Sequence, residues 1–271
     1  SVGIVHTLEP LADGAGDEIF GKISKCVNYA DISGNGGAAG IGYEITGDIE
    51  DCQNRGAVSS YSTAAGVAKV IRGNIKNTQN YGSVSGNNDC AAGLVIEGEG
   101  GITDSANYGE VLTSGGSAGG IAFDFTGVIN NSQNAGRVAK TGWGDQKYVA
   151  GLACRARGQI KDSENNGIIF VGNTAEFIGA ITGEMAGQII KSKHLGELIQ
   201  NNAGVNPPMY AGGITAVLNA APAYGDPLLS ECVVSGAIQI AAGKASVGVI
   251  ACIYPAGSIT DCEGYGIIYN L

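Results

Sequence analysis

The chain has 271 residues, including 46 glycines and 6 prolines, and its formal net charge is −10. The acidic balance, without a cluster of Lys and Arg, excludes a typical nucleic-acid-binding surface, and no apolar run approaches the roughly 20 residues of a membrane-spanning helix. The few prolines and the lack of a strict three-residue glycine period exclude collagen. The composition therefore predicts a folded protein of short strands and tight turns.

The first residues precede the repeated part of the chain. Gly3-Ile4 match one strand of the repeat described below, so we expect the chain to enter in mid-coil, with an insertion or cap from His6 to Phe20. We divide the chain into a partial coil with a cap-like insertion (1–20) and one repeat domain (21–271). We also expect a fragment of a longer protein, in which open ends contact flanking domains or pair end to end.

A nine-residue pattern then recurs. It reads CVNYADISG at 26–34, CQNRGAVSS at 52–60, TQNYGSVSG at 78–86, SANYGEVLT at 105–113, SQNAGRVAK at 132–140 and SENNGIIFV at 163–171. We call the small residue that opens each copy its anchor. The nine anchors are Cys26, Cys52, Thr78, Ser105, Ser132, Ser163, Ser192, Cys232 and Cys262. Because each copy is too short to bury its own apolar face, we expect the copies to stack.

Three short apolar runs, separated by glycine-rich turns, make up each copy. Ile or Leu lies three residues before each anchor and Ile, Val or Leu six residues after it, while a third run begins with AAG or AGG in most copies. No run has the length or period of a helix, and β-branched residues favour strands. The sequence predicts an all-β parallel β-solenoid, right-handed by the crossover rule, with about nine coils of roughly 26–31 residues.

An asparagine stands two residues after most anchors. Because like residues lie on like residues in a solenoid, we expect these amides to form a hydrogen-bonded ladder inside the rod. The predicted ladder residues are Asn28, Asn54, Asn80, Asn107, Asn134 and Asn165. His194 follows in the same column, and we expect it to act there as a structural substitute for Asn.

The repeats resemble the GLUG-type repeats of bacterial surface proteins. AAGLVIEGEGGITDSANYGEV at 91–111 and AGGIAFDFTGVINNSQNAGRV at 118–138 carry the resemblance, which extends over nearly the whole chain from about Gly21. Such repeats occur in adhesins and in non-catalytic regions of secreted IgA-type metallopeptidases. The resemblance implies an extracellular stalk or adhesive region at the cell surface. No H-E-x-x-H motif is present, so a peptidase role is not carried over.

Insertions and aromatic residues indicate where the rod contacts a partner. Inserted segments fall near 141–148, 201–208 and 219–227, and loops that emerge from a solenoid often bind ligands, although drift in surface loops also explains them. Adjacent coils place two tyrosines of one outward column about 4.8 Å apart. The predicted contact residues are Tyr81, Tyr108, Trp143, Tyr210 and Tyr224.

Catalytic chemistry finds little support in the sequence. His6 and His194 are the only histidines, and no cofactor or metal motif is present. Asp51, Asp104 and Asp162 share an outward column before the anchors, which we interpret as a solvated polar face. The seven cysteines include no C-x-x-C pair, and we expect small buried thiols rather than disulfides.

We therefore expect a non-enzymatic, adhesin-like domain, extracellular or on the cell surface. It would display loops and an outer face to a host glycan or protein, without binding nucleic acid, inserting into a membrane or needing a cofactor. Two alternatives remain open, a polysaccharide-degrading β-helix enzyme with paired carboxylates and a structural spacer in a larger secreted protein.

Overall fold

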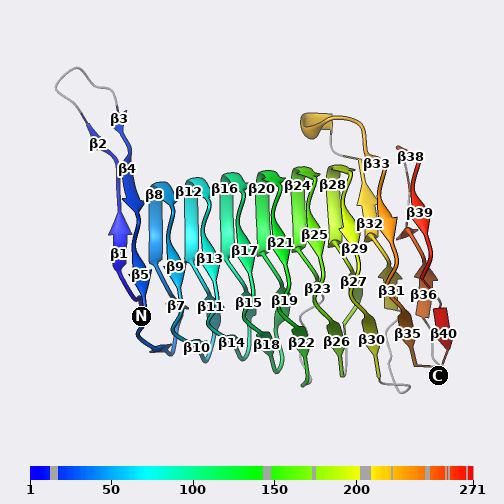
Figure 1. The fold of residues 1–271 in the computed structure, drawn as a ribbon, viewed down its shortest axis with the longest axis horizontal. Helices are drawn as coiled ribbons and strands as arrows, with labels where there is room; N and C mark the ends of the chain where they lie inside the picture. The colour runs from blue at the N-terminus through cyan, green and yellow to red at the C-terminus, as the bar shows by residue number, and fades with distance from the viewer. Residues whose placement is uncertain are drawn as a thin grey trace.

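The structure is a computed structural model of the whole chain. It describes residues 1–12, 18–142, 148–172, 175–201, 209–220, 222–241, 245–253, 255, 257–266 and 268–270. In these residues the chain forms a rod of stacked coils, with the N-terminus at one end and the C-terminus at the other (Figure 1). The expected parallel β-solenoid is confirmed.

Each coil passes through four faces of the rod, which we name by their strands. The alanine sheet contains β7 (Ala38–Ala39), β11 (Thr63–Ala65), β15 (Cys90–Ala92), β19 (Ser117–Gly119), β23 (Tyr148–Ala150), β27 (Phe177–Gly179), β31 (Met209–Gly212) and β36 (Ala245–Gly248). The long sheet contains β1 (Val5–Leu8), β4 (Gly21–Ser24), β8 (Gly42–Glu50), β12 (Ala68–Lys76), β16 (Val95–Thr103), β20 (Ala122–Asn130), β24 (Ala153–Lys161), β28 (Thr182–Ile190), β32 (Thr215–Asn219), β33 (Leu228–Ser230), β37 (Ala251–Ile253) and β38 (Ser258–Thr260).

The other two faces follow in each coil. The asparagine sheet contains β5 (Val27–Asn28), β9 (Gln53–Asn54), β13 (Gln79–Asn80), β17 (Ala106–Asn107), β21 (Gln133–Asn134), β25 (Glu164–Asn165), β29 (Lys193–His194), β34 (Val233–Val234) and β39 (Glu263–Gly264). The valine sheet contains β6 (Ile32–Gly34), β10 (Val58–Ser60), β14 (Val84–Gly86), β18 (Val111–Thr113), β22 (Val138–Lys140), β26 (Ile169–Val171), β30 (Leu198–Gln200), β35 (Ile238–Ile240) and β40 (Ile268–Asn270).

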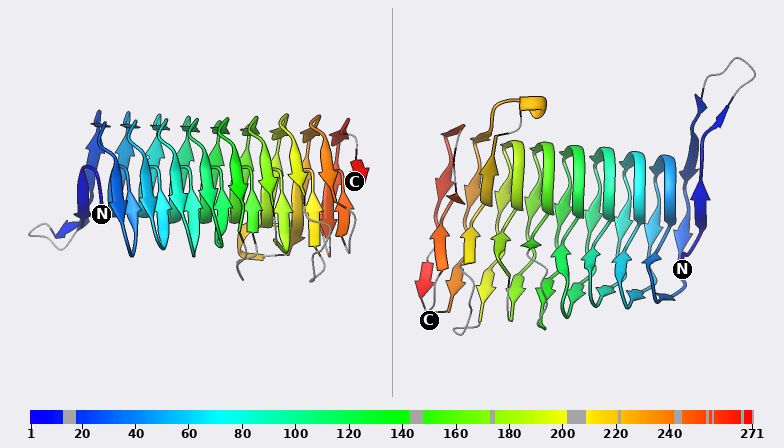
Figure 2. Two further views of the ribbon diagram at one scale, coloured as in Figure 1. Left: turned by 90° about the horizontal axis from the view of Figure 1, so that it is seen from below. Right: turned by 180° about the vertical axis from the view of Figure 1, so that it is seen from behind.

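The strands of neighbouring coils pair in parallel and in register, as Figure 2 shows along the rod. Ile75 lies between Ile49 and Ile102 in the long sheet, and Val84 lies between Val58 and Val111 in the valine sheet. The central isoleucines of this column are at most 1% exposed. Stacking therefore buries the apolar columns that a single repeat leaves open.

The chain turns from the long sheet into the asparagine sheet through a left-handed residue just before each anchor. In all nine coils this residue is not glycine, and its φ lies between 46° and 55°. The residues are Lys25, Asp51, Asn77, Asp104, Asn131, Asp162, Lys191, Glu231 and Asp261. The ladder asparagines do not adopt this backbone conformation.

Glycines five residues before the anchors occupy a second special conformation. Gly73 has φ 146°, and a Cβ there would lie 2.2 Å from the carbonyl oxygen of Gly47 in the preceding coil. Glycine is required because a side chain would collide with the adjacent backbone.

The first coil is interrupted by a short hairpin. β1 pairs with β8 beside β4, and between them β2 (Leu11–Ala12) and β3 (Glu18–Ile19) form an antiparallel pair. Near the other end the 3-10 helix η1 (Pro222–Tyr224) lies between β32 and β33, at the corresponding place in the coil (Figure 1). Both insertions project from the same edge of the rod, so they leave the stacked core undisturbed.

Candidate functional site

The interior of the asparagine sheet is fixed by a continuous row of amide hydrogen bonds. Each ladder asparagine donates from Nδ2 to the Oδ1 of the next ladder asparagine, at 2.7–2.8 Å, from Asn28 through to Asn165. The same Nδ2 groups also donate to a carbonyl two residues further along the chain, as from Asn107 to Gly109. The predicted ladder is confirmed, and it holds the outer face of this sheet in place.

The anchors form a second row, which the sequence indicated only as a need for small residues. The amide of Thr78 donates to the Ser105 hydroxyl at 3.1 Å, and that hydroxyl donates to the Thr103 carbonyl at 2.8 Å. Equivalent contacts join Ser105 to Ser132 and Ser132 to Ser163. A hydroxyl suits this position because it can accept a hydrogen bond from the backbone amide of the preceding coil while it donates one to a carbonyl of its own coil.

Tyr81 and Tyr108 lie on the outer face of the asparagine sheet. Their rings stack with centroids 5.1 Å apart and planes 13° apart, and the two residues are 46% and 42% exposed. The Arg55 guanidinium lies 5.2 Å from the Tyr81 ring centre. Among the described residues, no second ring stacks on the other face of Tyr108, where the column continues as Ala135. This pair is therefore an exposed aromatic surface with one open end.

A hollow of about 370 Å³ borders Tyr108, and we call it the Ala106 hollow. It is lined by Gln79, Asp104, Ser105, Ala106, Tyr108, Asn131, Ser132, Gln133, Asp162 and Glu164. Gln133 Nε2 donates to the Tyr108 hydroxyl at 3.0 Å, which fixes the ring against the wall. An aromatic ring, amides and carboxylates thus converge on one concave surface, as in sites for small polar ligands.

The carboxylates of the outer column are partly tied to amides of the next coil. Asn77 Nδ2 donates to Asp51 Oδ1 at 2.7 Å, and Asn131 Nδ2 donates to Asp104 Oδ1 at 2.6 Å. Asp51 and Asp104 are thus each followed in the column by a neutral donor. This pairing supports the interpretation of a polar outer face.

The other predicted contact residues do not join the Ala106 hollow. Tyr210 is the last ring of a Tyr148–Phe177–Tyr210 stack on the alanine sheet, with centroids 5.2 and 5.6 Å apart. Tyr224 lies in η1 and is 37% exposed. Trp143 and the predicted insertion 201–208, apart from Asn201, lie outside the described residues.

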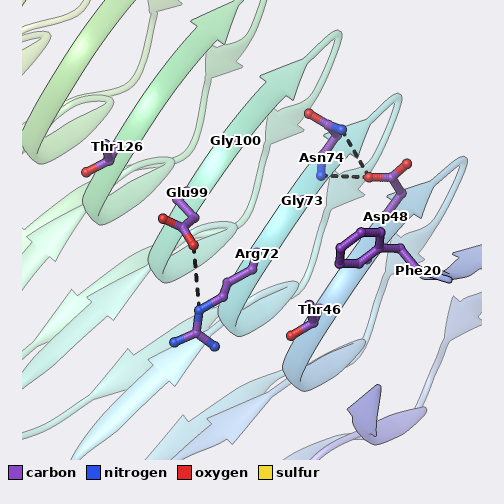
Figure 3. A pocket seen from close by; sticks show the side chains of 10 residues that line it. Phe20, Thr46, Asp48, Arg72, Gly73, Asn74, Glu99, Gly100 and Thr126 are labelled. Carbon is purple, nitrogen blue, oxygen red and sulfur yellow. Dashed lines mark hydrogen bonds and ion pairs between the residues drawn. The ribbon is translucent and has the colours of Figure 1, made fainter. Parts of the chain in front are cut away.

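A second, larger hollow of about 780 Å³ crosses the long sheet (Figure 3). Gly47, Gly73 and Gly100 form its floor, and Phe20 closes one end. Asn74 donates from its backbone and its side chain to Asp48 Oδ1 at 2.9 and 3.0 Å, and Arg72 pairs with Glu99 at 3.6 Å. The polar side chains of this hollow mainly pair with one another, and its glycines contribute only backbone atoms, so few side-chain groups are left to contact a ligand.

The thiols behave as packing residues. All seven cysteines are free, and burial raises the pKa of the Cys90 and Cys232 thiols to about 12. Burial also raises the pKa of the Cys154 thiol well above its usual value. These thiols stay protonated at neutral pH and are poor nucleophiles.

Neither metal ligands nor a membrane span emerge from the described residues. No group of three or more His, Cys, Asp or Glu side chains is placed there to hold a metal ion. No helix in the described part of the chain is long and apolar enough to cross a membrane.

No family model matches the chain, and the search of curated proteins also found no match.

The sequence did not predict the Ala106 hollow, and Tyr108 is the one residue of its lining that was predicted to contact a ligand. The available signal was a break in the column one residue after the anchors. Gln53, Gln79 and Gln133 occupy that column in nearby coils, and Ala106 replaces a glutamine between them. The one missing side-chain amide thus marks the place where the face is hollowed.

Proposed function

We propose that the chain is a non-enzymatic, adhesin-like binding domain of a bacterial surface or secreted protein, with repeats of the GLUG type. The observation that carries this proposal is the exposed Tyr81–Tyr108 stack beside the polar Ala106 hollow on a stacked rod. Aromatic rings pack against the apolar faces of sugars, and neighbouring amides and carboxylates bind hydroxyl groups. The ligand is a glycan, held on the outer face of the asparagine sheet.

A rod is suited to display because its binding face is fixed before the ligand arrives. The amide ladder lies directly beneath the outward side chains of the same short strands, and Gln133 fixes the Tyr108 hydroxyl. Preorganised side chains lose little conformational entropy on binding.

A glycan array probed with the full chain tests the proposal. We expect retention of one glycan class, and loss of about tenfold in affinity when Tyr108→Ala removes the ring, since an aromatic stacking contact is worth about 0.5–1.5 kcal/mol beyond the area it buries and about 1.4 kcal/mol is a factor of ten. Tyr29→Ala is the matched control, because Tyr29 occupies the same column in the first coil, away from the hollow. Equal losses in both variants, or no glycan retained, would contradict the proposal.

The carboxylates of the hollow favour one second candidate, a polysaccharide-degrading enzyme. Asp104, Asp162 and Glu164 come from two different coils and line the same concavity. Pairs of carboxyl groups can act as acid and base on a glycosidic bond. A reducing-sugar assay on every glycan that binds decides between the candidates, because turnover that disappears in Asp104→Asn and Glu164→Gln would establish the enzyme instead.

A further inference from the structure

The Ala106 hollow lies where one outward column has an alanine in place of the glutamine found in the adjacent coils. Outward residues on this face stand one before, one after and three after each anchor, so Ala106 lies between Asp104 and Tyr108 within its own coil. Along the rod its neighbours are Gln79 and Gln133. Ala106 is only 5% exposed, so the surrounding side chains rise above it and form the walls. The hollow is thus a defined cup, open to solvent.

The charge of this cup is negative. Its described lining contains three carboxylates and no Lys or Arg. Asp162 and Glu164 each have a lysine at the rim, Lys161 at 3.7 Å and Lys193 at 3.8 Å. Asp104 differs from both, because in the described residues it forms no ion pair and only the neutral amide of Asn131 donates to it. Asp104 is therefore the carboxylate of the Ala106 hollow whose charge no described cation compensates.

This combination of groups matches a sugar that carries an amine. An ammonium group donates a charge-assisted hydrogen bond to Asp104 while the sugar ring packs against Tyr108, whereas a uronic or sialic acid is repelled. The amides of Gln79 and Gln133 flank that position with both donors and acceptors, which suits a ring with several hydroxyl groups better than the methylenes of a lysine side chain.

We propose that the Ala106 hollow selects glycans with free amino groups, with oligomers of unacetylated hexosamine as the ligand class. This inference rests on the proposed glycan-binding function and adds the chemical basis of its selectivity. Asp104 binds the amine, Tyr108 packs against the ring, and Gln79 and Gln133 bind hydroxyl groups.

Calorimetric titration of the full chain with three oligosaccharides of equal length tests the selectivity. The probes are a glucosamine oligomer, its fully N-acetylated counterpart and an oligogalacturonate. We expect the glucosamine oligomer to bind at least tenfold more tightly than the acetylated one, the oligogalacturonate not to bind, and added salt to weaken the first interaction.

Two variants place this binding in the hollow. Asp104→Asn keeps a side chain that tolerates the left-handed backbone, as Asn77 and Asn131 do in the same column, and removes only the charge. Ala106→Gln fills the cup with the residue found in neighbouring coils. Both are expected to lower the affinity for the glucosamine oligomer about tenfold or more, because one charge-assisted hydrogen bond is worth about that factor.

Asp51→Asn is the matched control. Asp51 accepts a hydrogen bond from Asn77 just as Asp104 does from Asn131, but Gln53 and Gln79 fill the adjacent column there. We expect this variant to bind as the unmodified chain does. An equal loss in Asp51→Asn and Asp104→Asn would overturn the assignment to the hollow.

The remaining outcomes distinguish the proposed selectivity for amines from the proposed binding of glycans. Equal affinity for the acetylated and unacetylated oligomers overturns the amine selectivity and leaves glycan binding intact. Binding of a polylysine peptide without binding of the glucosamine oligomer overturns the sugar assignment in favour of a basic protein segment. Failure of every probe, together with an empty glycan array, overturns both proposals.

Discussion

Asn165 donates through Nδ2 to the imidazole Nδ1 of His194 at 3.1 Å, so a histidine takes the next place in the row of amides. The imidazole is fully buried, and its Nε2 has no partner among the described residues. Burial lowers the pKa of His194 to about 4. The column continues as Val234, so the hydrogen-bonded ladder stops at the imidazole.

His194 should make the stability of the rod depend on pH. In the unfolded chain the pKa is about 6.5, so between pH 6.5 and 4 the unfolded state binds the proton that the folded state excludes. The stabilisation is complete above about pH 6.5 and is lost as the pH falls toward 4, by up to about 3 kcal/mol.

His194→Asn removes this titration and lets Asn165 donate to an amide oxygen instead. We expect the thermal midpoint of the variant, followed by circular dichroism, to fall less between pH 7.5 and 4.5 than that of the unmodified chain. The carboxylates contribute equally to both proteins, so the difference isolates the imidazole. Parallel pH profiles for the two proteins would show that His194 has no part in the acid sensitivity.

Breaking the ladder in its centre should destabilise the rod. Asn107→Ala leaves the Oδ1 of Asn134 without its donor and removes the acceptor of Asn80, both in a buried site. Each buried polar group left unpaired costs about 1–3 kcal/mol. Chemical denaturation should show a loss of about 2 kcal/mol or more for the two groups together, against less than about 0.5 kcal/mol for the surface variant Gln53→Ala. A similar midpoint for both variants would argue against the ladder as a stabilising element.

Replacing glycine by alanine should destabilise the rod where the neighbouring backbone is close, as at Gly73, and should have little effect where space is open, as at Gly36. At Gly73, alanine meets the Gly47 carbonyl oxygen at 2.2 Å with φ at 146°, whereas around Gly36 no atom lies within 4 Å. We expect Gly73→Ala to lower the free energy of unfolding by about 2 kcal/mol or more, and Gly36→Ala to change it little. Denaturant titration of both variants checks this, and equal stability would mean that the backbones can separate.

Thiol labelling should follow burial. Cys26 and Cys262 are partly exposed at the two ends of the anchor row, whereas Cys90, Cys154 and Cys232 are buried with raised pKa values. Because the thiolate is the reactive form, iodoacetamide at pH 8 should modify Cys26 and Cys262 first. Peptide mass spectrometry over time gives the order. Early labelling of Cys154 would show that the rod opens there.

The register of the solenoid could be predicted because its columns repeat once per coil. Ile75 and Ile102 occupy the same place in successive copies, and the structure pairs them directly. The asparagine ladder followed from the same argument, because identical amides in register lie within hydrogen-bonding distance of one another.

The left-handed corners could not be read from the sequence in the same way. Lys25 and Glu231 occupy these corners although neither residue favours positive φ. The neighbouring coil holds them there, since the Lys25 amide donates to the Glu50 carbonyl and the Glu231 amide to the Thr260 carbonyl. Tertiary contact therefore decides this conformation, and local propensity does not reveal it.

The Ala106 hollow also needed the structure. Its walls come from four successive coils, and their side chains converge only once three outward columns are known to share one face. The sequence contained the gap at Ala106, but its meaning depended on the height of Gln79 and Gln133 around it.

All five hydrogen bonds between the side-chain amides from Asn28 to Asn165 point the same way. The donor lies in one coil and the acceptor in the next coil toward the C-terminal end. Their dipoles add along the axis instead of cancelling, as peptide dipoles do in a helix. The interior of the asparagine sheet thus carries a dipole along the rod axis, and its direction is set by the order in which the coils donate and accept.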